Sequence, residues 1–327
     1  MNTSLAVSSI ARSLAAAVLV CIAAPAGAQA YPAKPIRVIV PYAPGASTDN
    51  MARLFGQKMQ EAWGQSVFND YKPGGNTIIG SEALTKAAPD GYTILLVVNT
   101  HAINPLLTKL PYDPIRDFAP ITTIGLSEYM LAVHPSVPAN TLRDLVAYAK
   151  AKNGQLNYST SGAGGLGHLS AELFNVLAGV KTQHIPFKGG APSVQALVAG
   201  DVQLCFIHPL NVLGQIRAGK LKAIAISGKS RLASLPDMPT FAEAGMPALE
   251  STNWFGMLAP AGTPRDILNK LSVEMNRIQT LSDMKEKLSV QGVDPFPGSP
   301  EQFAALIKSD MDKFAKIVKS ANIKLEN

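Results

Sequence analysis

IRVIVPYAPGASTDNMARLF, residues 36–55, has the pattern of a β-strand, a tight turn and an α-helix in succession. The apolar, β-branched run at 36–40 predicts the strand and is typical of a strand covered on both faces. Proline and glycine at 41–45 predict the turn, and Ser47 and Thr48 are suitable N-cap residues for the helix. Such a turn leaves backbone N–H groups unpaired at the positive end of a helix dipole. The stretch therefore fits either an anion site or an ordinary unliganded turn, and one turn alone does not distinguish them.

The first 30 residues differ from the rest of the chain and have the pattern of a secretory signal peptide. Arg12 supplies a positive charge, residues 14–24 are apolar, and A-Q-A at 28–30 is a cleavage signal, so we expect cleavage before Tyr31. The apolar run is too short to cross a bilayer, and no later stretch is long and apolar enough. These features predict a soluble protein exported to the periplasm.

Composition limits the possible partners of the mature chain. Cys205, within VQLCFI, is the cysteine that remains after cleavage, so we expect a buried, inert thiol and no intramolecular disulfide. Without Arg12 the formal charge falls from +6 to +5, and the basic residues are scattered, so nucleic acid is not an expected partner. A mature chain of nearly 300 residues predicts two domains.

Strands alternate with helices after the first turn, which predicts a mainly parallel sheet. The clearest buried strand, YTILLVV at 92–98, runs directly into Asn-Thr-His at 99–101. In parallel sheets, ligands bind beyond the carboxyl ends of the strands. We therefore expect the segments 41–49 and 99–101 to lie together at one edge of a sheet.

The same pattern begins again near residue 135, which predicts a second α/β unit that repeats the architecture without a strong sequence repeat. A short strand at 156–160 is followed by a glycine turn at 161–167 and a helical leucine stripe. The helices after residue 264 follow too few strands to form a third domain, so we expect them to pack back on one of the first two units. Two helix starts have the spacing of capping boxes, Thr141 with Asp144 and Ser299 with Gln302.

The second glycine turn contains a dinucleotide-binding pattern that lacks an essential part. Gly162, Gly164 and Gly167 fit G-x-G-x-x-G between a strand and a helix. The acidic residue that should follow about 20 residues later is missing, because this region reads HIPFKGG at 184–190. We therefore reject NAD binding and expect a second helix N-terminus with unpaired backbone donors.

No pattern of a nucleophilic or metal-dependent enzyme occurs in the sequence. G-x-S-x-G is absent, and the five histidines show no metal-ligand spacing. GKS at 228–230 resembles the end of a P-loop, but Ala223 stands where its leading glycine is needed. Ser47 and Ser161 have no recognisable base, so we expect each to cap a helix or contact a ligand. We expect no catalytic residue, no metal and no cofactor.

The histidines differ in their expected roles. His134 and His184 are expected to be structural. His101 and His208 each follow an apolar strand, which places them at a sheet edge, and both ligand contact and simple exposure remain open for them. His168 falls in the first turn of the helix after the second glycine turn, a position that suits an anion.

Eight segments occur in a characteristic order. They are PYAPGASTDNMAR (41–53), KPGGNTIIG (72–80), APDGYTILL (88–96), STSGAGGLGHLSAELF (159–174), IPFKGGAPSVQALVAGDVQ (185–203), GKLKAIAIS (219–227), LPDMPTFAEAG (235–245) and WFGMLAPAGTP (254–264). Each is weak alone, but in combination they resemble the receptors of tripartite tricarboxylate transporters, of the Bug or TctC type. The resemblance covers the chain from Tyr31 to its end.

This resemblance implies an α/β fold of two lobes, as in periplasmic binding proteins. Each lobe would be a mainly parallel sheet flanked by helices, and two crossover strands would join them. One lobe would comprise residues 31–130 and 253–327, and the other residues 131–252. The chain would cross between them near 128–133 and 251–258, which explains why the last helices do not form a third domain.

The resemblance also implies a carboxylate held by backbone N–H groups and bridging waters of the two turns, at 42–49 and 159–168. The family commonly has a second glycine where this chain has Ala46, so a methyl group would lie near the expected carboxylate. The expected ligand-binding residues are Tyr42, Ala43, Gly45, Ala46, Ser47, Thr48, Asp49, Asn99, Thr100, His101, Ser159, Ser161, Gly162, Ala163, His168, Phe187, His208 and Trp254.

Side-chain chemistry adds two expectations about the ligand. Neutral donors at the turns suit a receptor that must release its ligand, and Asp49, whose charge would repel an anion, is expected to cap its own loop. Tyr42, Phe187 and Trp254 would flank an aromatic ring if they faced the cleft, whereas core packing explains the same residues. Aliphatic and aromatic carboxylates, including aromatic dicarboxylates, therefore both remain open.

The expected partners follow from the same resemblance. We expect a monomer that delivers a small carboxylate to membrane transporter subunits. The alternative is a sensing module that docks on a membrane signalling partner and feeds no transport.

Overall fold

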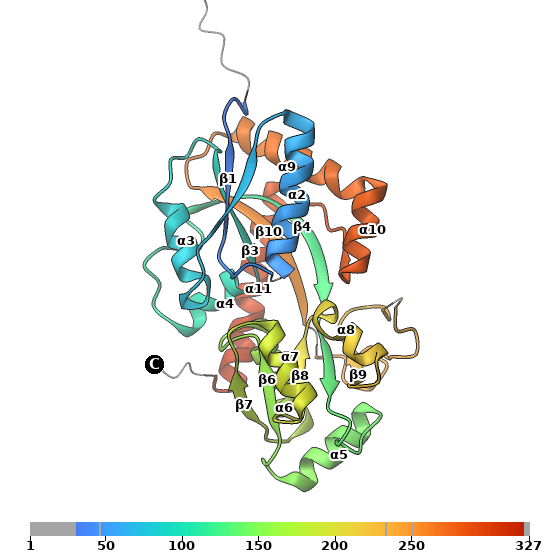
Figure 1. Ribbon diagram of the computed structural model, residues 1–327. Coiled ribbons are helices and arrows are strands. Elements are labelled where there is room, and N and C mark those ends of the chain that lie inside the picture. Colours follow the sequence, from blue (N-terminus) through green and yellow to red (C-terminus); the bar gives the residue numbers. More distant parts are fainter. Residues whose placement is uncertain (1–30, 46, 233, 250, 324–327) are drawn as a thin grey trace, which may run out of the picture. The chain divides into compact units, whose positions relative to one another are not determined.

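Two β-sheets organise the chain in the computed structural model, which describes residues 31–45, 47–232, 234–249 and 251–323 (Figure 1). The predicted signal peptide at 1–30 and Ala46 therefore lie outside the described residues. From residue 35 onward the chain forms one compact unit that contains both sheets. No helix in the described part of the chain has the length and apolar character needed to cross a bilayer.

The first sheet has six strands in the order β11-β4-β10-β3-β1-β2. Its members are β1 (Ile36–Val40), β2 (Val67–Tyr71), β3 (Thr93–Val98), β4 (Phe118–Glu128), β10 (Thr252–Pro260) and β11 (Val293–Asp294). β1 pairs in parallel with β2 and β3. β10 lies between β3 and β4 and runs antiparallel to both, and β11 is antiparallel to β4.

The second sheet has five strands in the order β7-β6-β8-β5-β9. They are β5 (Met130–Val133), β6 (Asn157–Thr160), β7 (Gln183–Pro186), β8 (Leu204–Ile207) and β9 (Lys222–Ile226). β6 pairs in parallel with β7 and β8, whereas β5 runs antiparallel to β8 and β9.

Both sheets share one topology. The order β2-β1-β3-β10-β4 in the first sheet is repeated as β7-β6-β8-β5-β9 in the second. In each sheet the reversed strand, β10 or β5, occupies the fourth place. The predicted repeat of architecture is therefore confirmed, and most strands of each sheet run in one direction, as predicted. The exceptions are β10, β11 and β5, whose reversal the sequence analysis did not predict.

Helices flank both sheets (Figure 1), as the fold-class prediction required. Those belonging to the first sheet are α2 (Ser47–Trp63), α3 (Ile78–Thr85), α4 (Thr100–Leu107), α9 (Arg265–Thr280), α10 (Ser282–Val290) and α11 (Pro300–Ser320), with a short 3-10 turn at Gly75–Thr77. Those belonging to the second are α5 (Leu142–Lys152), α6 (Leu166–Ala178), α7 (Gly190–Ala199) and α8 (Pro209–Arg217). Both predicted capping boxes are present, at the starts of α5 and α11.

The last helix packs on elements of both sheets. Phe314 and Ile317 of α11 form one apolar cluster with Ile103 of α4 and with Leu166 and Leu169 of α6. Burying apolar surface between these helices stabilises their arrangement. The C-terminal helices therefore pack back on the earlier units, as predicted, but α11 contacts elements of both units where one was expected. Cys205 is a buried free thiol in β8, as expected.

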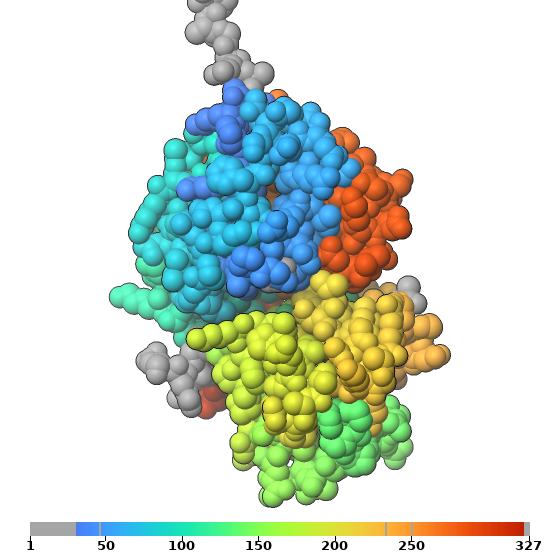
Figure 2. Space-filling model, viewed as in Figure 1, coloured from blue at the N-terminus to red at the C-terminus, as the bar shows by residue number. Residues whose placement is uncertain are grey.

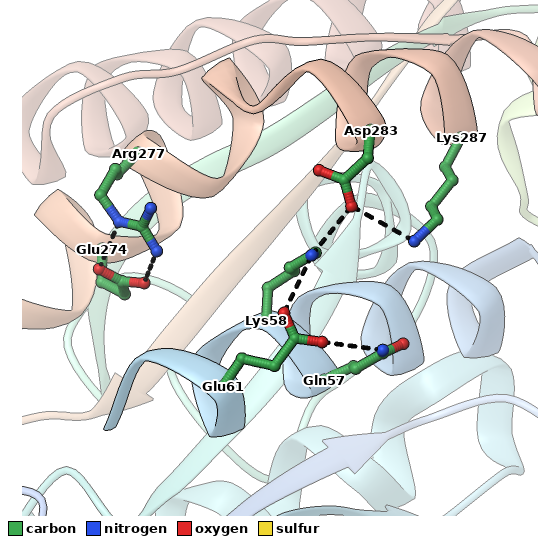
Figure 3. Close-up of polar contacts among 7 residues, drawn as sticks. All are labelled: Gln57, Lys58, Glu61, Glu274, Arg277, Asp283 and Lys287. Carbon is green, nitrogen blue, oxygen red and sulfur yellow. Dashed lines mark hydrogen bonds and ion pairs between the residues drawn. The ribbon is translucent and has the colours of Figure 1, made fainter. Parts of the chain in front are cut away.

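Surface ion pairs connect α2 with α10 (Figure 3). Lys58 Nζ lies 2.9 Å from Asp283 of α10 and 2.9 Å from Glu61 of its own helix, and Asp283 also pairs with Lys287 at 3.5 Å. In Figure 2 the surface of α10 lies directly beside that of α2. Exposed ion pairs of this kind contribute little to the free energy of unfolding.

The core of the first sheet requires a glycine at 256. Trp254 and Phe303 pack edge to face with ring centroids 5.1 Å apart, and a Cβ on Gly256 would collide with the Phe303 ring. We therefore expect Gly256→Ala to lower the free energy of unfolding by about 1–3 kcal/mol, because the buried ring has to move. Urea denaturation of the mature chain measures this.

Gly214→Ala is the matched control for this prediction. Gly214 is exposed in α8, and an added Cβ would meet no atom within 4 Å. We expect this change to be neutral or to stabilise by up to about 1 kcal/mol, because alanine favours helix more than glycine does. Equal stability of the two variants would contradict the packing argument.

Candidate functional site

The first glycine turn joins β1 to α2 and is closed by its own helix. Gly45 has a φ of +88°, a left-handed conformation that glycine adopts without steric cost. Its N–H donates to Asp49 Oδ2 at 2.8 Å, so a side chain in the first turn of α2 satisfies a donor of the preceding loop. The prediction that Asp49 caps its own loop is confirmed.

Asp49 is 3% exposed and its carboxylate is fully engaged. Besides Gly45 N–H, it accepts hydrogen bonds from Tyr71 Oη at 2.6 Å and from Arg53 Nε at 2.8 Å. Burial alone would raise the pKa of Asp49, but the bonds from Tyr71, Gly45 and Arg53 outweigh burial and lower the pKa. The negative charge is therefore compensated by groups of the loop, of α2 and of β2.

The second glycine turn joins β6 to α6 by the same device. Gly164 N–H donates to His168 Nδ1 at 3.1 Å, again to a side chain four residues later in the first turn of the helix. At the other end of the turn, Thr160 Oγ1 donates to Gly162 O at 2.9 Å. No side chain caps α6 at Gly165, so the N-terminus of this helix presents backbone donors.

Tyr42 connects the first turn with the end of β3. Its Oη lies 2.8 Å from Thr100 Oγ1, which confirms that segments 41–49 and 99–101 meet at one edge of the sheet. Burial raises the pKa of Tyr42 to about 12, although the bond to Thr100 partly opposes this shift. The phenol therefore stays protonated and neutral at physiological pH.

Tyr129 relates to residues of both turns. The sequence analysis gave this tyrosine no role. It lies between β4 and β5, where the chain passes from one sheet to the other. A Cβ on Gly167, in the first turn of α6, would lie 3.3 Å from Tyr129 Cε1. Burial raises the pKa of Tyr129, and the nearby Tyr42 phenol raises it further. Tyr129 thus packs beside the helix that follows the second turn, and its phenol lies within electrostatic range of Tyr42 of the first turn.

The strands that connect the sheets are tied together by Glu128, the neighbour of Tyr129. Its Oε2 accepts hydrogen bonds from Ser227 Oγ at 2.7 Å and from Thr252 Oγ1 at 3.0 Å. Burial raises the pKa of Glu128, and these two bonds partly offset the shift. The GKS triplet at 228–230 begins beside this carboxylate, which agrees with the rejection of a P-loop.

Residues 51–323 match the model of the tripartite tricarboxylate transporter family receptor. The chain belongs to this family. BugT of Bordetella pertussis is 34% identical over 308 residues, which are 93% of this chain and 94% of BugT. The family resemblance predicted from the sequence is confirmed.

Two solved structures of Rhodopseudomonas palustris proteins resemble this receptor. Rpa4515 with adipate has a TM-score of 0.85 at 32% identity and covers 90% of this chain and 99% of its own. MatC with bound malate has a TM-score of 0.81 at 30% identity and covers 88% and 100%. The fold of the receptor is therefore that of the periplasmic binding proteins.

Several residues predicted at the ligand site of the receptor lie in internal networks. Asn99 is completely buried, donates through Nδ2 to Asp310 at 2.8 Å and accepts from Trp254 N–H at 3.1 Å. Trp254 is 1% exposed, and its Nε1 donates to Asp310 at 2.7 Å. Ser159 is buried and donates to Ser193 O at 3.1 Å.

Of the two alternatives left open for His101 and His208, simple exposure is wrong, because both side chains are buried. The sequence analysis missed α4, which begins at Thr100 and carries the His101 ring into the core, where Nε2 lies 2.9 Å from Pro114 O. His208 Nδ1 lies 2.6 Å from Ser127 Oγ. Burial lowers the pKa of both histidines to about 4, so both are neutral at physiological pH.

The other residues predicted at the ligand site differ in how far they are exposed to solvent. Ala43, Gly45, Ser161 and Ala163 are exposed, whereas Tyr42, Ser47, Gly162 and Phe187 are half-buried. Thr48 is buried, and its Oγ1 has no hydrogen-bond partner in the described part of the chain. Within the residues that the structure describes, no group of three or more His, Cys, Asp or Glu side chains is arranged to hold a metal ion.

Removing the Asp49 side chain tests its role in the first turn. Asp49→Ala leaves Gly45 N–H and Tyr71 Oη without their acceptor, so we expect the free energy of unfolding to fall by about 2 kcal/mol near neutral pH. Because the pKa of Asp49 is lowered below its ordinary 3.8, this contribution is present above that value and is lost as the pH falls through the lowered pKa. The difference between wild type and variant should therefore shrink in acid.

Asp312→Ala, which removes an exposed carboxylate from α11, is the control for nonspecific loss of charge. Urea denaturation at several pH values measures both variants. Unchanged stability of Asp49→Ala combined with an altered ligand preference would contradict the capping role.

Proposed function

We propose that this receptor binds a small carboxylate between its two glycine turns, with no covalent chemistry. The observation that carries the proposal is the equivalence of the turns: each ends a strand, opens a helix and has its glycine N–H bonded to a side chain four residues later. Tyr129 packs beside the second turn's helix and lies within electrostatic range of Tyr42 of the first turn. Backbone N–H groups at a helix N-terminus bind anions through hydrogen bonds and the helix dipole. Two such ends facing one ligand suit a molecule with two anionic groups.

The donors proposed for the ligand are those that the protein leaves unused. The N–H groups of Gly45, Gly162 and Gly164 are already bonded to side chains, which leaves the remaining backbone amides and the hydroxyls of Ser47, Thr48 and Ser161. The Thr48 hydroxyl supports this assignment, because a buried hydroxyl without a partner in the protein requires a ligand or a water molecule.

Neutral donors also explain how the ligand is released. The phenol of Tyr42 stays protonated, and Asp49 is neutralised by its own partners, so no unpaired charge is proposed to face the ligand. A bidentate arginine would bind a carboxylate more tightly but hold it longer. A receptor that delivers its ligand to a transporter requires the weaker arrangement.

The side chains in internal networks are proposed to support the site without touching the ligand. Asn99 fixes the end of β3 beside Tyr42, and His208 fixes Ser127 beside Tyr129. Because Trp254 is enclosed in the core on Phe303, it does not flank a ligand ring in this proposal. Malate in MatC and adipate in Rpa4515 support an aliphatic dicarboxylate.

Two surface hollows lie elsewhere. One is lined by residues such as Glu172, Asn175 and Lys181, and the other by residues between Pro105 and Asp117. Both are wide open to solvent, where charge interactions with a small anion are strongly screened. We therefore place the carboxylate at the turns.

Transport from the periplasm completes the proposal. The predicted signal peptide at 1–30 directs export, and the mature monomer delivers its ligand to membrane transporter subunits. Residues 31–130 and 253–327 form one lobe and 131–252 the other, and they close on the ligand by bending at the crossings near 128–133 and 251–258.

A ligand that binds only the folded state raises the melting temperature. We expect aliphatic dicarboxylates to stabilise the mature chain in a thermal-shift panel that also contains mono- and tricarboxylates and aromatic diacids. At a ligand concentration of 100 times Kd the stabilisation is about 2.7 kcal/mol. A flat response across the panel would overturn the proposal, and a response to aromatic diacids alone would overturn the aliphatic assignment.

Thr48→Val sharpens this experiment. Because Thr48 Oγ1 has no partner in the protein, its replacement should leave the stability of the unliganded chain unchanged but weaken dicarboxylate binding about tenfold, the value of one hydrogen bond. Thr280→Val, which removes a hydroxyl bonded to Arg277 O at an exposed helix end, is the control and should not affect binding. Equal affinity of Thr48→Val and wild type would exclude Thr48 from the site.

A further inference from the structure

Three stacked rings from three different elements lie beside the second glycine turn. The His184 ring of β7 stacks on His168 of α6 at a centroid distance of 4.0 Å and on Tyr158 of β6 at 4.9 Å, with interplanar angles of 12° and 17°. Tyr158 also lies 6.4 Å from His168, so the three rings form a compact cluster. Tyr158 is fully buried, and its Oη donates to Glu172 of α6 at 2.5 Å. The stack therefore fixes the position of the His168 ring.

The stack holds the turn at two points. His184 Nε2 lies 2.7 Å from Thr160 Oγ1, the hydroxyl that bonds the backbone of Gly162. His168 Nδ1 accepts the N–H of Gly164 at 3.1 Å. Gly162 and Gly164 flank Ala163, so the middle of the turn is fixed on both sides.

Both histidines are neutral at physiological pH. Burial lowers the pKa of His168, although the charge of Glu172 partly opposes the shift. Burial and the neighbouring His168 lower the pKa of His184 to about 3. A neutral His168 that accepts at Nδ1 carries its proton on Nε2.

We propose that His168 is a positioning residue of the ligand site: by accepting the Gly164 N–H, its Nδ1 turns the neighbouring amides of Ser161 and Ala163 toward the bound carboxylate. This inference rests on the proposed carboxylate function. It replaces the sequence-based expectation that His168 itself contacts the ligand.

The choice of histidine follows from charge. The first turn uses a carboxylate, Asp49, in the equivalent place four residues after its glycine, and Arg53 lies 2.8 Å away to neutralise it. α6 contains no lysine or arginine. A carboxylate at position 168 would therefore lack such a partner on its own helix and would repel the ligand, whereas a neutral imidazole accepts the same hydrogen bond without that cost.

Two variants separate the acceptor from the ring. His168→Asn keeps an acceptor at nearly the same reach but loses the stacked ring, whereas His168→Phe keeps a stacked ring but has no acceptor. We expect stability to follow the ring, so that the asparagine variant melts at a lower temperature than the phenylalanine variant. Dicarboxylate affinity should follow the acceptor and fall at least tenfold in His168→Phe but less than threefold in His168→Asn.

Amide hydrogen exchange of Gly164 in the ligand-free chain provides a readout that does not depend on binding. Its protection should persist in His168→Asn and be lost in His168→Phe. His134→Asn, at a half-buried histidine bonded to Ser136, is the control and should change neither affinity nor the exchange of Gly164. The probe for affinity is the dicarboxylate that stabilises the wild type most.

The outcomes distinguish the two proposals. A wild-type chain that binds no carboxylate overturns the proposed function, and the Gly164 exchange rates then decide whether His168 still orders the turn. Affinity that follows the ring, or Gly164 protection that survives in His168→Phe, overturns the positioning role while leaving the carboxylate function intact.

Discussion

The first backbone N–H groups of an α-helix have no partner within the helix, and this constraint shapes both glycine turns. At each turn a side chain four residues later accepts the glycine N–H, Asp49 for Gly45 and His168 for Gly164. These bonds close each loop on its own helix and leave the amides between them without a partner in the helix. A rigid loop with free donors binds a ligand at a lower entropic cost than a flexible one.

The repeated sheet topology places the two turns at equivalent positions in their sheets. Each turn follows the second strand in the common order, β1 or β6, and the reversed fourth strand, β10 or β5, is part of a connection between the sheets. The cost of this arrangement is a set of buried polar groups at the crossings. Glu128, Ser227 and Thr252 satisfy one another there, which holds the connecting strands together while Tyr129 remains beside them.

Local patterns made much of the fold predictable. The β-branched runs predicted the strands, and Thr141 and Ser299 predicted helix starts that the capping boxes confirm, because all of these depend on neighbouring residues in the chain. α4 escaped detection, since it is short and contains Pro105. The reversal of β10 depends on pairing with strands more than a hundred residues away, for which the sequence of β10 itself carries no signal.

Only those parts of the proposed site that consist of local backbone turns and their caps could be predicted from the sequence. The glycine turns and the capping role of Asp49 follow from local spacing. The burial of Asn99 and Trp254 depends on Asp310 of α11, and the stack of His168 on His184 joins separate elements, so neither follows from spacing along the chain. The sequence indicated only that Tyr129 lies at the predicted crossing between the lobes. Its position beside α6 follows from the three-dimensional structure.

The central claim is that one dicarboxylate contacts both turns at once. Titration followed by amide chemical shifts tests this most directly, because each backbone donor reports separately. The account predicts that the amides of Ser47 and Thr48 and those of Ser161 and Ala163 shift together with a single Kd. Shifts confined to one turn, or to the hollow around Glu172 and Lys181, would contradict it.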